Sequence, residues 1–404
     1  MSQATGPLAG VKVVTCSTAQ AGTVPYTLMA DLGAEVVKIE VPGKGDASRT
    51  AGQVEGYPSS YFETNNRGVK SLTLNLKDPR GQEILHKLVA EADIFGQNFR
   101  PGAAEKNGFG YEDLKKINPK LVYASISGYG PDGPHAALPG TDAMGQALGG
   151  VAEAFSQPGQ PMRTGIVSVA DETCAILTFG GVLAALHHAN ATGVGQKVDT
   201  SLLGGQIRMQ GWTLTTTMWR GSNPVTGQAR MVGTEKRPGM SASFEDRDGK
   251  PFVFQLAGRK WHTAMQALGF HEELEAIGLG DLGPAVVSEE RRVQMLAKLD
   301  ECFARDSRDR WVEVLRAADI VAAPINTLLE ASNDPDVLAN GYVAEVDYPE
   351  HGRTARVHGS PWKFSETPPQ FGQAPKLGEH SGELLARIGY SEKDIEALRE
   401  DGVI

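Results

Sequence analysis

The chain has 404 residues, of which 40% are hydrophobic and 22% charged, a balance typical of a globular protein with a large buried core. Its formal net charge of -10 argues against general nucleic-acid binding, which needs a basic surface to displace counterions. Cys16, Cys174 and Cys302 are too sparse for a disulfide framework, so we expect a reducing, cytoplasmic location. Residues 1–8 lack the pattern of a signal peptide, and the apolar stretch 174–186 is too short to span a bilayer.

The first 130 residues alternate between short apolar runs and amphipathic helical patterns. Strands are expected at residues 11–15, 36–39, 72–76, 94–95 and 121–126, with helices at 24–32, from 79 onward and at 111–117. Gly33 can end the first helix, and Asp78 can cap the second with Pro79 in its first turn. Strands and helices that alternate at this spacing predict an α/β fold with a doubly wound, mainly parallel, Rossmann-like sheet.

The remaining chain suggests a smaller domain inserted into the larger one. Residues 128–142 are a loop rich in Gly and Pro, and residues 170–186 form a strongly apolar helix. Further elements are a strand and helix from 197, a linker at 217–240, a turn at Asp248-Gly249, helices at 261–268, 289–303 and 309–317, a hairpin at 342–357 and a helix at 391–399. We therefore predict a large domain at 1–224, a small α+β domain at 225–325, and a segment at 326–404 that returns to the large domain.

Several chemical motifs are weak or missing. The turn STAQAG after the first strand has one glycine where a dinucleotide-binding GxGxxG would have three, and the chain contains neither a phosphate-binding GxxxxGK nor a GxSxG nucleophile motif. His187 and His188 are adjacent, so on a helix they point about 100° apart and do not face one metal. We predict no metal site.

Asp171 is the strongest single candidate for chemistry. It opens the helix DETCAILTFGGVLAAL, which is apolar almost all round and is therefore expected to be buried. The helix dipole would favour an ionised carboxylate there. Local sequence leaves two interpretations open: Asp171 caps the helix, or it acts as a nucleophile towards an activated carbonyl.

Motifs spread over almost the whole chain resemble class III CoA-transferases, the superfamily that includes formyl-CoA transferase, carnitine CoA-transferase and α-methylacyl-CoA racemase. The motifs are specific by their order and spacing. They are LAGVKVV, STAQAG, DLGAEVVKIEVPGKGD, NNRGVKSLTLNLKDPRG, NFRPGAAEKNGFGYEDL, LVYASISGYGPDGP, DAMGQALGG, LAALHHANATGVGQKVDTSLL, NDPDVLANGYV and APKLGEHSGELLARIGY.

The resemblance implies that Asp171 is the catalytic nucleophile and that acyl-CoA is a substrate rather than a tightly bound cofactor. Asp171 would attack the donor thioester and form a mixed anhydride, which CoA then converts to an aspartyl-CoA thioester. The backbone amides of Gln20 and Ala21 would stabilise the oxyanions. The residues implied to bind CoA are Gln20, Ala21, Leu74, Asn75, Lys77, Asn98, Phe99, Arg100 and Lys106. For the three cations, exposure as ordinary surface charges is the alternative.

The chain departs from the family pattern at two places. Residues 234–243 (TEKRPGMSAS) replace the glycine run that closes over the intermediate in formyl-CoA transferase. Val41 replaces a basic residue that some relatives have there.

Two alternatives and several expectations about partners accompany this interpretation. A racemase would carry histidine where this chain has Thr141, and threonine is no general base near neutral pH. A CoA-binding subunit of a heteromer would not need Asp171. The resemblance also implies an interlocked homodimer. The acids remain open: succinyl-CoA is a common donor, and Trp212, Met218 and Trp219 could contact a bulky acceptor or a dimer partner.

Overall fold

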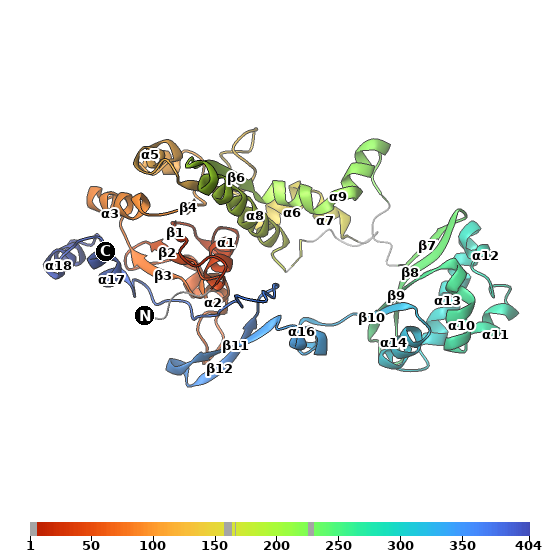
Figure 1. Ribbon diagram of the computed structural model, residues 1–404. Coiled ribbons are helices and arrows are strands. Elements are labelled where there is room, and N and C mark those ends of the chain that lie inside the picture. The colour runs from red at the N-terminus through yellow and green to blue at the C-terminus, as the bar shows by residue number, and fades with distance from the viewer. Residues whose placement is uncertain (1–5, 157–163, 166, 225–229) are drawn as a thin grey trace. The chain divides into compact units, whose positions relative to one another are not determined.

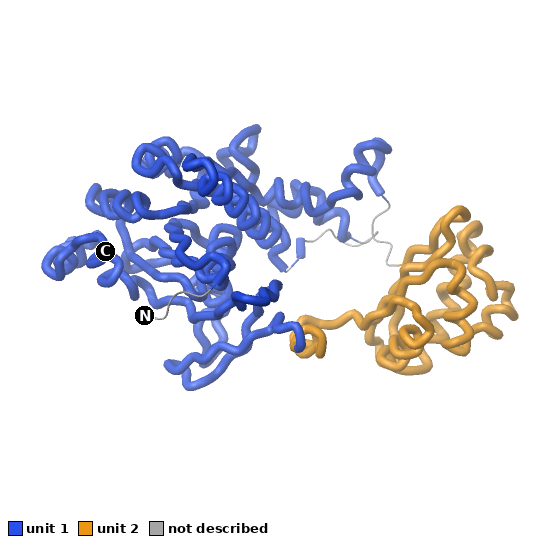
Figure 2. The backbone as a smooth tube through the Cα atoms, in the orientation of Figure 1, with its two compact units in different colours: residues 1–224, 339–404 blue, residues 225–338 orange. Residues whose placement is uncertain are grey.

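The computed structural model describes residues 6–156, 164–165, 167–224 and 230–404. The chain separates into two compact units, of which the first combines Met1–Pro224 with Ala339–Ile404 and the second is Val225–Leu338 (Figure 2). The first unit is therefore built from two stretches that are distant in sequence. The second unit extends to Leu338, beyond the boundary near residue 325 that the sequence suggested.

A six-stranded parallel sheet forms the centre of the first unit, as predicted (Figure 1). Its strands are β1 (Lys12–Thr15), β2 (Glu35–Glu40), β3 (Lys70–Thr73), β4 (Ile94–Gln97), β5 (Val122–Ser127) and β6 (Lys197–Ser201). The strand order is β3-β2-β1-β4-β5-β6, and every neighbouring pair is parallel. The order reverses between β1 and β4, which in such sheets places a ligand crevice at the carboxyl ends of the strands.

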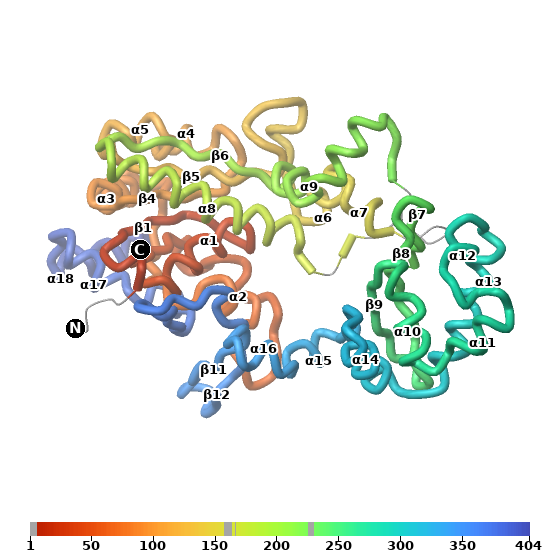
Figure 3. Tube along the Cα trace, turned by 45° about the vertical axis from the view of Figure 1, so that its right-hand side comes forward, coloured from red at the N-terminus to blue at the C-terminus, as the bar shows by residue number. Residues whose placement is uncertain are grey.

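Helices cover both faces of this sheet because successive strand residues point to opposite sides. Val13 packs on one face with α1 (Ala19–Asp31) and α8 (Val169–Thr192). Val14 packs on the other face, which is covered by α3 (Pro79–Ala90), α5 (Tyr111–Ile117), α17 (Ser381–Arg387) and α18 (Glu392–Glu400). Figure 3 shows α1 and α8 side by side, and α17 and α18 next to each other. The C-terminal stretch thus completes the core of the first unit.

Local signals set several helix ends as expected. The side chain of Asp78 accepts a hydrogen bond from the backbone amide of Arg80, and Pro79 follows it in the first turn of α3. The side chain of Ser391 accepts from the amide of Asp394 and so caps α18. These contacts satisfy amides that have no acceptor inside the helix.

Shorter elements complete the first unit. They are the 3-10 helices η1 (Ala47–Thr50) and η3 (Pro349–His351), the helices α2 (Ser60–Asn66), α4 (Ala103–Lys106), α6 (Asp142–Leu148), α7 (Val151–Ala154) and α9 (Leu202–Arg220), and the strands β11 (Val343–Tyr348) and β12 (Arg353–His358). Strands β11 and β12 pair antiparallel, which confirms the predicted hairpin. Helix α9 is broken at Gly211, whose φ of 51° and ψ of -121° are not helical.

The second unit has a four-stranded antiparallel sheet in the order β10-β9-β8-β7. Its elements are β7 (Arg230–Thr234), β8 (Arg237–Glu245), β9 (Pro251–Ala257), η2 (Gly258–Lys260), α10 (Trp261–Leu268), α11 (His271–Ala276), α12 (Gly283–Val287), α13 (Glu289–Phe303), α14 (Arg308–Ala317), β10 (Val321–Pro324) and α15 (Leu328–Ser332), with α16 (Pro335–Ala339) at its end. The turn at Asp248-Gly249 joins β8 and β9 as predicted. The predicted linker at 217–240 is wrong at both ends, because residues 217–220 belong to α9 and residues 230–240 enter β7 and β8. Residues 225–229 lie outside the described residues.

Helix α8 is buried on one side only, contrary to the expectation of burial all round. Ala175 and Val182 are fully buried, whereas Ile176 is 53% and Leu177 39% exposed. Within the described part of the chain, α8 is the one helix that could cross a membrane by length and composition. Its contacts with α1 and β5 are those of a helix at the core of a sheet protein.

Candidate functional site

A cavity of about 480 Å³ lies at the carboxyl edge of the parallel sheet, where the strand order reverses. Its walls come from the chain after β1, β4 and β5, and from α2, α6, α8 and the start of α9. We call it the first cavity. The lining residues discussed below are Ala19, Ala21, Tyr61, Asn98, Phe99, Arg100, Thr141, Asp142 and Asp171.

Asp171 lies on the wall of this cavity but does not cap α8. The helix begins at Val169 after Ser168, so Asp171 is its third residue. The amides of Ala170 and Asp171 donate hydrogen bonds of 2.8 and 3.1 Å to Oδ1 of Asp142. The N-capping interpretation of Asp171 is therefore wrong, because Asp142 from α6 accepts at this helix end.

The surroundings of Asp171 disfavour its charged form. Burial is the largest effect, followed by the negative charges of Asp142 and Glu172, and together they raise the pKa of Asp171 to about 7. The expectation that the helix dipole keeps Asp171 fully ionised is therefore wrong. The free amides at this helix end bond to Asp142 instead.

Gln20 and Ala21 belong to the first turn of α1 rather than to a loop, since α1 begins at Ala19. Amides in a first helical turn have no acceptor within the helix and can donate to a ligand. Ala21 lines the first cavity, and Nε2 of Gln20 donates to Oε1 of Glu172 at 2.5 Å. The starts of α1 and α8 therefore border the same cavity.

Two polar residues of the first cavity were missed by the sequence analysis. Tyr61 comes from α2, a helix that no pattern predicted. Burial, with the charge of Asp171 next in size, raises its pKa to about 12, so the phenol stays a hydrogen-bond donor at neutral pH. Asp142 gave no signal of its own beside Thr141. Asp142 raises the pKa of Asp171 only because α6 and α8 meet in the fold, and the sequence does not show that contact.

A second cavity of about 320 Å³ collects other predicted residues. Leu74, Asn75 and Lys77 line it, just after the carboxyl end of β3, which stops at Thr73 instead of continuing to residue 76. Phe99 lines both cavities and so forms a wall that they share.

The remaining predicted cations are placed differently. Arg100 lines the first cavity. Lys106, the last residue of α4, is exposed and lines neither cavity. Val41 lines the second cavity and is 57% exposed. The structure therefore brings all the predicted CoA-binding residues except Lys106 to the two cavities or, for Gln20, to their rim.

Both polar atoms of the Asn98 side chain are hydrogen-bonded to the backbone of Thr18. Its Oδ1 accepts from the amide of Thr18 at 3.0 Å, and its Nδ2 donates to the carbonyl of Thr18 at 2.7 Å. A Cβ added at Gly22 would lie 2.5 Å from this Nδ2, so only glycine leaves room for it. Asn98 thus shapes the turn before α1.

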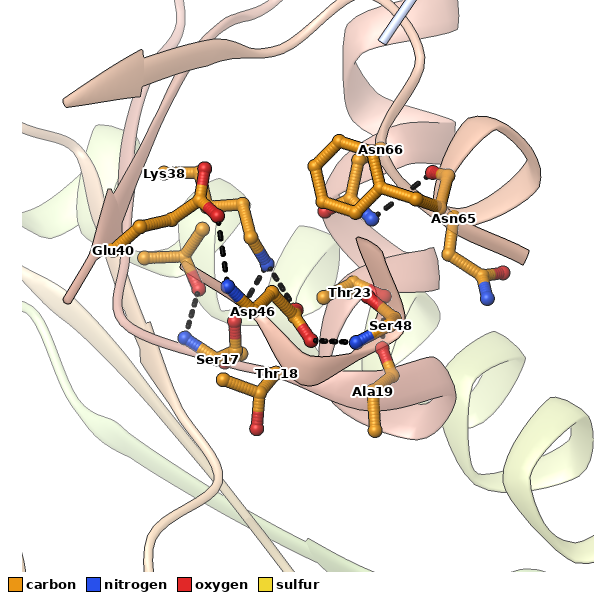
Figure 4. A network of polar contacts seen from close by, with 12 residues as sticks. Ser17, Thr18, Ala19, Thr23, Lys38, Glu40, Asp46, Ser48, Asn65 and Asn66 are labelled. Atoms are coloured by element: carbon orange, nitrogen blue, oxygen red, sulfur yellow. Dashed lines mark hydrogen bonds and ion pairs between the residues drawn. The ribbon is translucent and has the colours of Figure 1, made fainter. Parts of the chain in front are cut away.

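A buried polar cluster lies beneath the same turn (Figure 4). Nζ of Lys38 donates at 2.8 Å both to the carbonyl of Ser17 and to Oδ2 of Asp46. The carboxylate of Glu40 accepts from Arg49 Nε at 2.8 Å and from the amide of Asp46 at 3.0 Å. The cluster therefore joins β2 to the segment that lines the second cavity.

No metal centre is apparent in the described parts of the chain, where no three His, Cys, Asp or Glu side chains are grouped to hold an ion. His187 and His188 are both exposed on α8. Residues 234–243, which replace the expected glycine run, form the β7–β8 hairpin of the second unit.

A parallel sheet with a cavity, a carboxylate and helix N-termini at its switch point is the arrangement in which doubly wound α/β proteins bind a ligand at the carboxyl edge. Residues 8–381 match the profile of the family described as CoA-transferase family III, so the chain belongs to this family and is a transferase. This confirms the resemblance that the motifs indicated.

Named relatives match along nearly their full length. The chain is 31% identical to human succinyl-CoA:glutarate CoA-transferase, covering 98% of this chain and 90% of that protein. It is 32% identical to formyl-CoA:oxalate CoA-transferase of Streptomyces avermitilis, covering 99% and 100%. The crystal structure of a CAIB/BAIF family protein from Brucella suis has a TM-score of 0.84 and 29% identity, covering 95% and 100%.

Proposed function

We propose that the protein transfers CoA from a donor acyl-CoA to an acceptor carboxylic acid, with Asp171 as the nucleophile. The observation that carries this proposal is the position of the Asp171 carboxylate. It lies in the first cavity, which also contains the first turn of α1 and shares Phe99 with the second cavity. A thioester in the first cavity and the rest of CoA in the second would suit this arrangement.

In the proposed reaction, a carboxylate oxygen of Asp171 attacks the thioester carbon, and the C–S bond breaks. This gives a mixed anhydride and CoA thiolate. The thiolate then attacks the aspartyl carbonyl, releases the donor acid and leaves aspartyl-CoA thioester. The acceptor carboxylate then attacks the aspartyl-CoA thioester and displaces CoA thiolate, and the thiolate attacks the acceptor carbonyl of the new anhydride, which gives acceptor acyl-CoA and frees Asp171. An activated anhydride or thioester bond is thus kept at every stage. A pKa of about 7 for Asp171 is compatible with this chemistry, because ionised carboxylate is still available at neutral pH and is more basic than an ordinary aspartate.

Each step passes through a tetrahedral oxyanion, and the first turn of α1 supplies the donors. We propose the amides of Gln20 and Ala21 for this role. The Tyr61 phenol, protonated at neutral pH, is a further donor on the same wall. The bond from Gln20 to Glu172 would keep the first turn of α1 in register with Asp171.

The second cavity is proposed to hold the nucleotide end of CoA. Leu74 and Phe99 supply apolar walls, and Lys77 supplies a positive charge for phosphate. Arg100, in the first cavity, is placed for a phosphate near the pantetheine or for the far carboxylate of a dicarboxylic acid. Two relatives carry glutarate and oxalate in their names, both dicarboxylates, so we propose a dicarboxylic substrate, with succinyl-CoA as the first donor to try.

A racemase remains the alternative within the superfamily. Thr141 lines the first cavity at the position where a racemase would carry its histidine. Incubation of a 2-methylacyl-CoA in deuterated water, with no acceptor acid, separates the two functions. Deuterium at the α-carbon would favour a racemase, whereas a CoA-transferase leaves that carbon unlabelled.

We propose an interlocked homodimer because apolar side chains remain uncovered on two helices. Trp212 and Trp219 of α9 are 80% and 84% exposed, and Ile176 of α8 is 53% exposed. Such surface in a single chain is typical of an interface. Light scattering after size-exclusion chromatography measures the mass. A protein that is inactive alone but active with a paralogue would favour a heteromer instead.

The decisive experiment compares the wild type with Asp171→Asn in a screen of acyl-CoA donors and acids. Mass spectrometry follows the new acyl-CoA and, after hydroxylamine or borohydride trapping, the label on the protein. We expect transfer by the wild type, label at position 171, and loss of at least about a thousandfold in kcat for the variant. Full transfer by the variant would remove Asp171 from the mechanism.

A further inference from the structure

The turn that leads into α1 has an unusual backbone. Ala19 has a φ of 59°, in the left-handed region that residues with a side chain rarely adopt. Such conformations persist only where surrounding contacts hold them, and they gather at functional sites. Ala19 lines the first cavity and directly precedes Gln20 and Ala21. The orientation of those two amides therefore depends on whatever holds this turn.

All four backbone groups of Ser17 and Thr18 are held by side chains. The amide of Ser17 donates to Oγ1 of Thr15 at 3.1 Å, and its carbonyl accepts from Nζ of Lys38 at 2.8 Å. The amide and carbonyl of Thr18 are both bonded to Asn98. The contacts that restrain Ala19 thus come from three different elements of the sheet edge.

Lys38 is the charged member of this set. Its Nζ forms an ion pair with Oδ2 of Asp46 at 2.8 Å, and both side chains are only 1% exposed. Figure 4 shows the ammonium between Ser17 and Asp46, beneath the turn. Asp46 lines the second cavity, and Ala19, two residues after Ser17, lines the first. One buried ammonium therefore ties the walls of both cavities together.

We propose that Lys38 is a positioning residue: held by Asp46, it fixes the turn at residues 17–19 and so aims the amides of Gln20 and Ala21 at the reacting carbonyl. The inference rests on the proposed function. Lys38 itself contacts neither substrate nor reacting atoms, and it exchanges no proton in the reaction. Its contribution is the geometry of the oxyanion donors, where small displacements reduce rates strongly.

The test is the double variant K38M/D46N. Removing both charges avoids leaving one buried ion without its partner. The new carboxamide at position 46 keeps an oxygen for the amide of Ser48, which now donates to Asp46 at 2.9 Å. We expect kcat to fall about ten- to a hundredfold. The KM for acyl-CoA should change less than about threefold, because Asp46, although it lines the second cavity, is only 2% exposed and its replacement keeps the same shape. Hydrogen–deuterium exchange at residues 17–21 should become faster.

A second buried pair provides the matched control. Arg67 is bonded to Asp31 at 2.6 Å, with side chains 2% and 3% exposed, and it also donates to a backbone carbonyl, that of His358. Neither Arg67 nor Asp31 lines the two cavities. The variant R67M/D31N loses the same kind of contact, and we expect its kcat within about twofold of the wild type, with exchange at residues 17–21 unchanged.

The proposal is overturned if both double variants lose kcat equally, or if K38M/D46N keeps the wild-type kcat and exchange rates. Failure of the proposed function gives a different result. In that case the wild type would transfer no CoA to any acid tested. The exchange measurement needs no substrate, so it would still show whether Lys38 holds the turn. Unchanged exchange at residues 17–21 in K38M/D46N would show that Lys38 does not fix the turn.

Discussion

Oδ1 of Asp142 accepts a hydrogen bond of 3.1 Å from the backbone amide of Asp171, so the carboxylate at the start of α8 is that of Asp142 and not that of Asp171. The capping of α8 and the proposed attack on the thioester therefore belong to two different aspartates, Asp142 and Asp171. Asp142 takes up the favourable field of the helix end, and its charge raises the pKa of Asp171. Burial, with the charges of Asp142 and Glu172, raises the pKa of Asp171 to about 7, so we expect the proposed reaction to depend on pH in the neutral range.

Asp142→Asn should move the acidic limb of the pH–rate profile to lower pH. The variant keeps an oxygen for the two amides but removes a negative charge, so the pKa of Asp171 falls from about 7. Activity at pH 6 relative to pH 8 should increase roughly threefold, measured as kcat/KM across pH. Asp132→Asn removes an exposed charge from the Gly- and Pro-rich loop that precedes α6 and should leave the profile unchanged. A limb that stays in place in both variants would contradict this assignment.

Asp171→Asn should stabilise the fold at high pH while it abolishes transfer. The folded pKa of about 7 lies above the ordinary 3.8, so folding favours the protonated form and wild-type stability falls as pH rises between these values. At pH 8 the variant should gain about 1–2 kcal/mol, less than the full linkage because the cavity is open to solvent. Thermal denaturation should show a gain at pH 8 and almost none near pH 4. An equal gain at both pH values would point to a cause other than charge.

Lys77→Ala and Lys106→Ala should differ, although the sequence assigned both residues to CoA. Lys77 lines the second cavity, whereas Lys106 is exposed and outside both cavities. We expect the KM for acyl-CoA to rise about five- to tenfold for Lys77→Ala and less than about twofold for Lys106→Ala. The rise for Lys77→Ala should be smaller at high ionic strength, because salt screens the attraction between lysine and phosphate. Steady-state kinetics at two ionic strengths measures this. A larger effect at Lys106 would require phosphate to lie beyond the described cavities.

The sequence predicted the parallel sheet because its signals are local. Asp78 and Pro79 mark the start of α3. The helix predicted at 170–186 is α8, which continues to Thr192 and ends at Gly193, where φ is 77°. The β7–β8 hairpin was missed for a local reason too. Its buried positions include small residues such as Ala242, and the glycines around it give the composition of a linker.

Most of the site residues that the motifs implied lie at the two cavities, but the motifs did not show the contacts among them. Asp171 is distinguished by its place in an apolar helix, and the motifs assign it a role. Tyr61 and Asp142 gave no such signal, because their effect arises where α2, α6 and α8 meet at one cavity. The pKa of Asp171 was misjudged for the same reason: the helix end was visible in the sequence, but the residue that occupies it was not.

Gly22→Ala should disturb the turn before α1 without touching a charged group. The new methyl would meet Nδ2 and Cγ of Asn98 at 2.5 and 2.7 Å, so this side chain must leave the backbone of Thr18. We expect a loss of about 1–3 kcal/mol in the free energy of unfolding and a clear fall in kcat. Gly382→Ala, in α17, is the control, since its methyl would meet nothing within 4 Å and helix propensity favours alanine by up to about 1 kcal/mol. Denaturant unfolding of both variants tests this, and equal stability of the two would show that Asn98 yields its place at no cost.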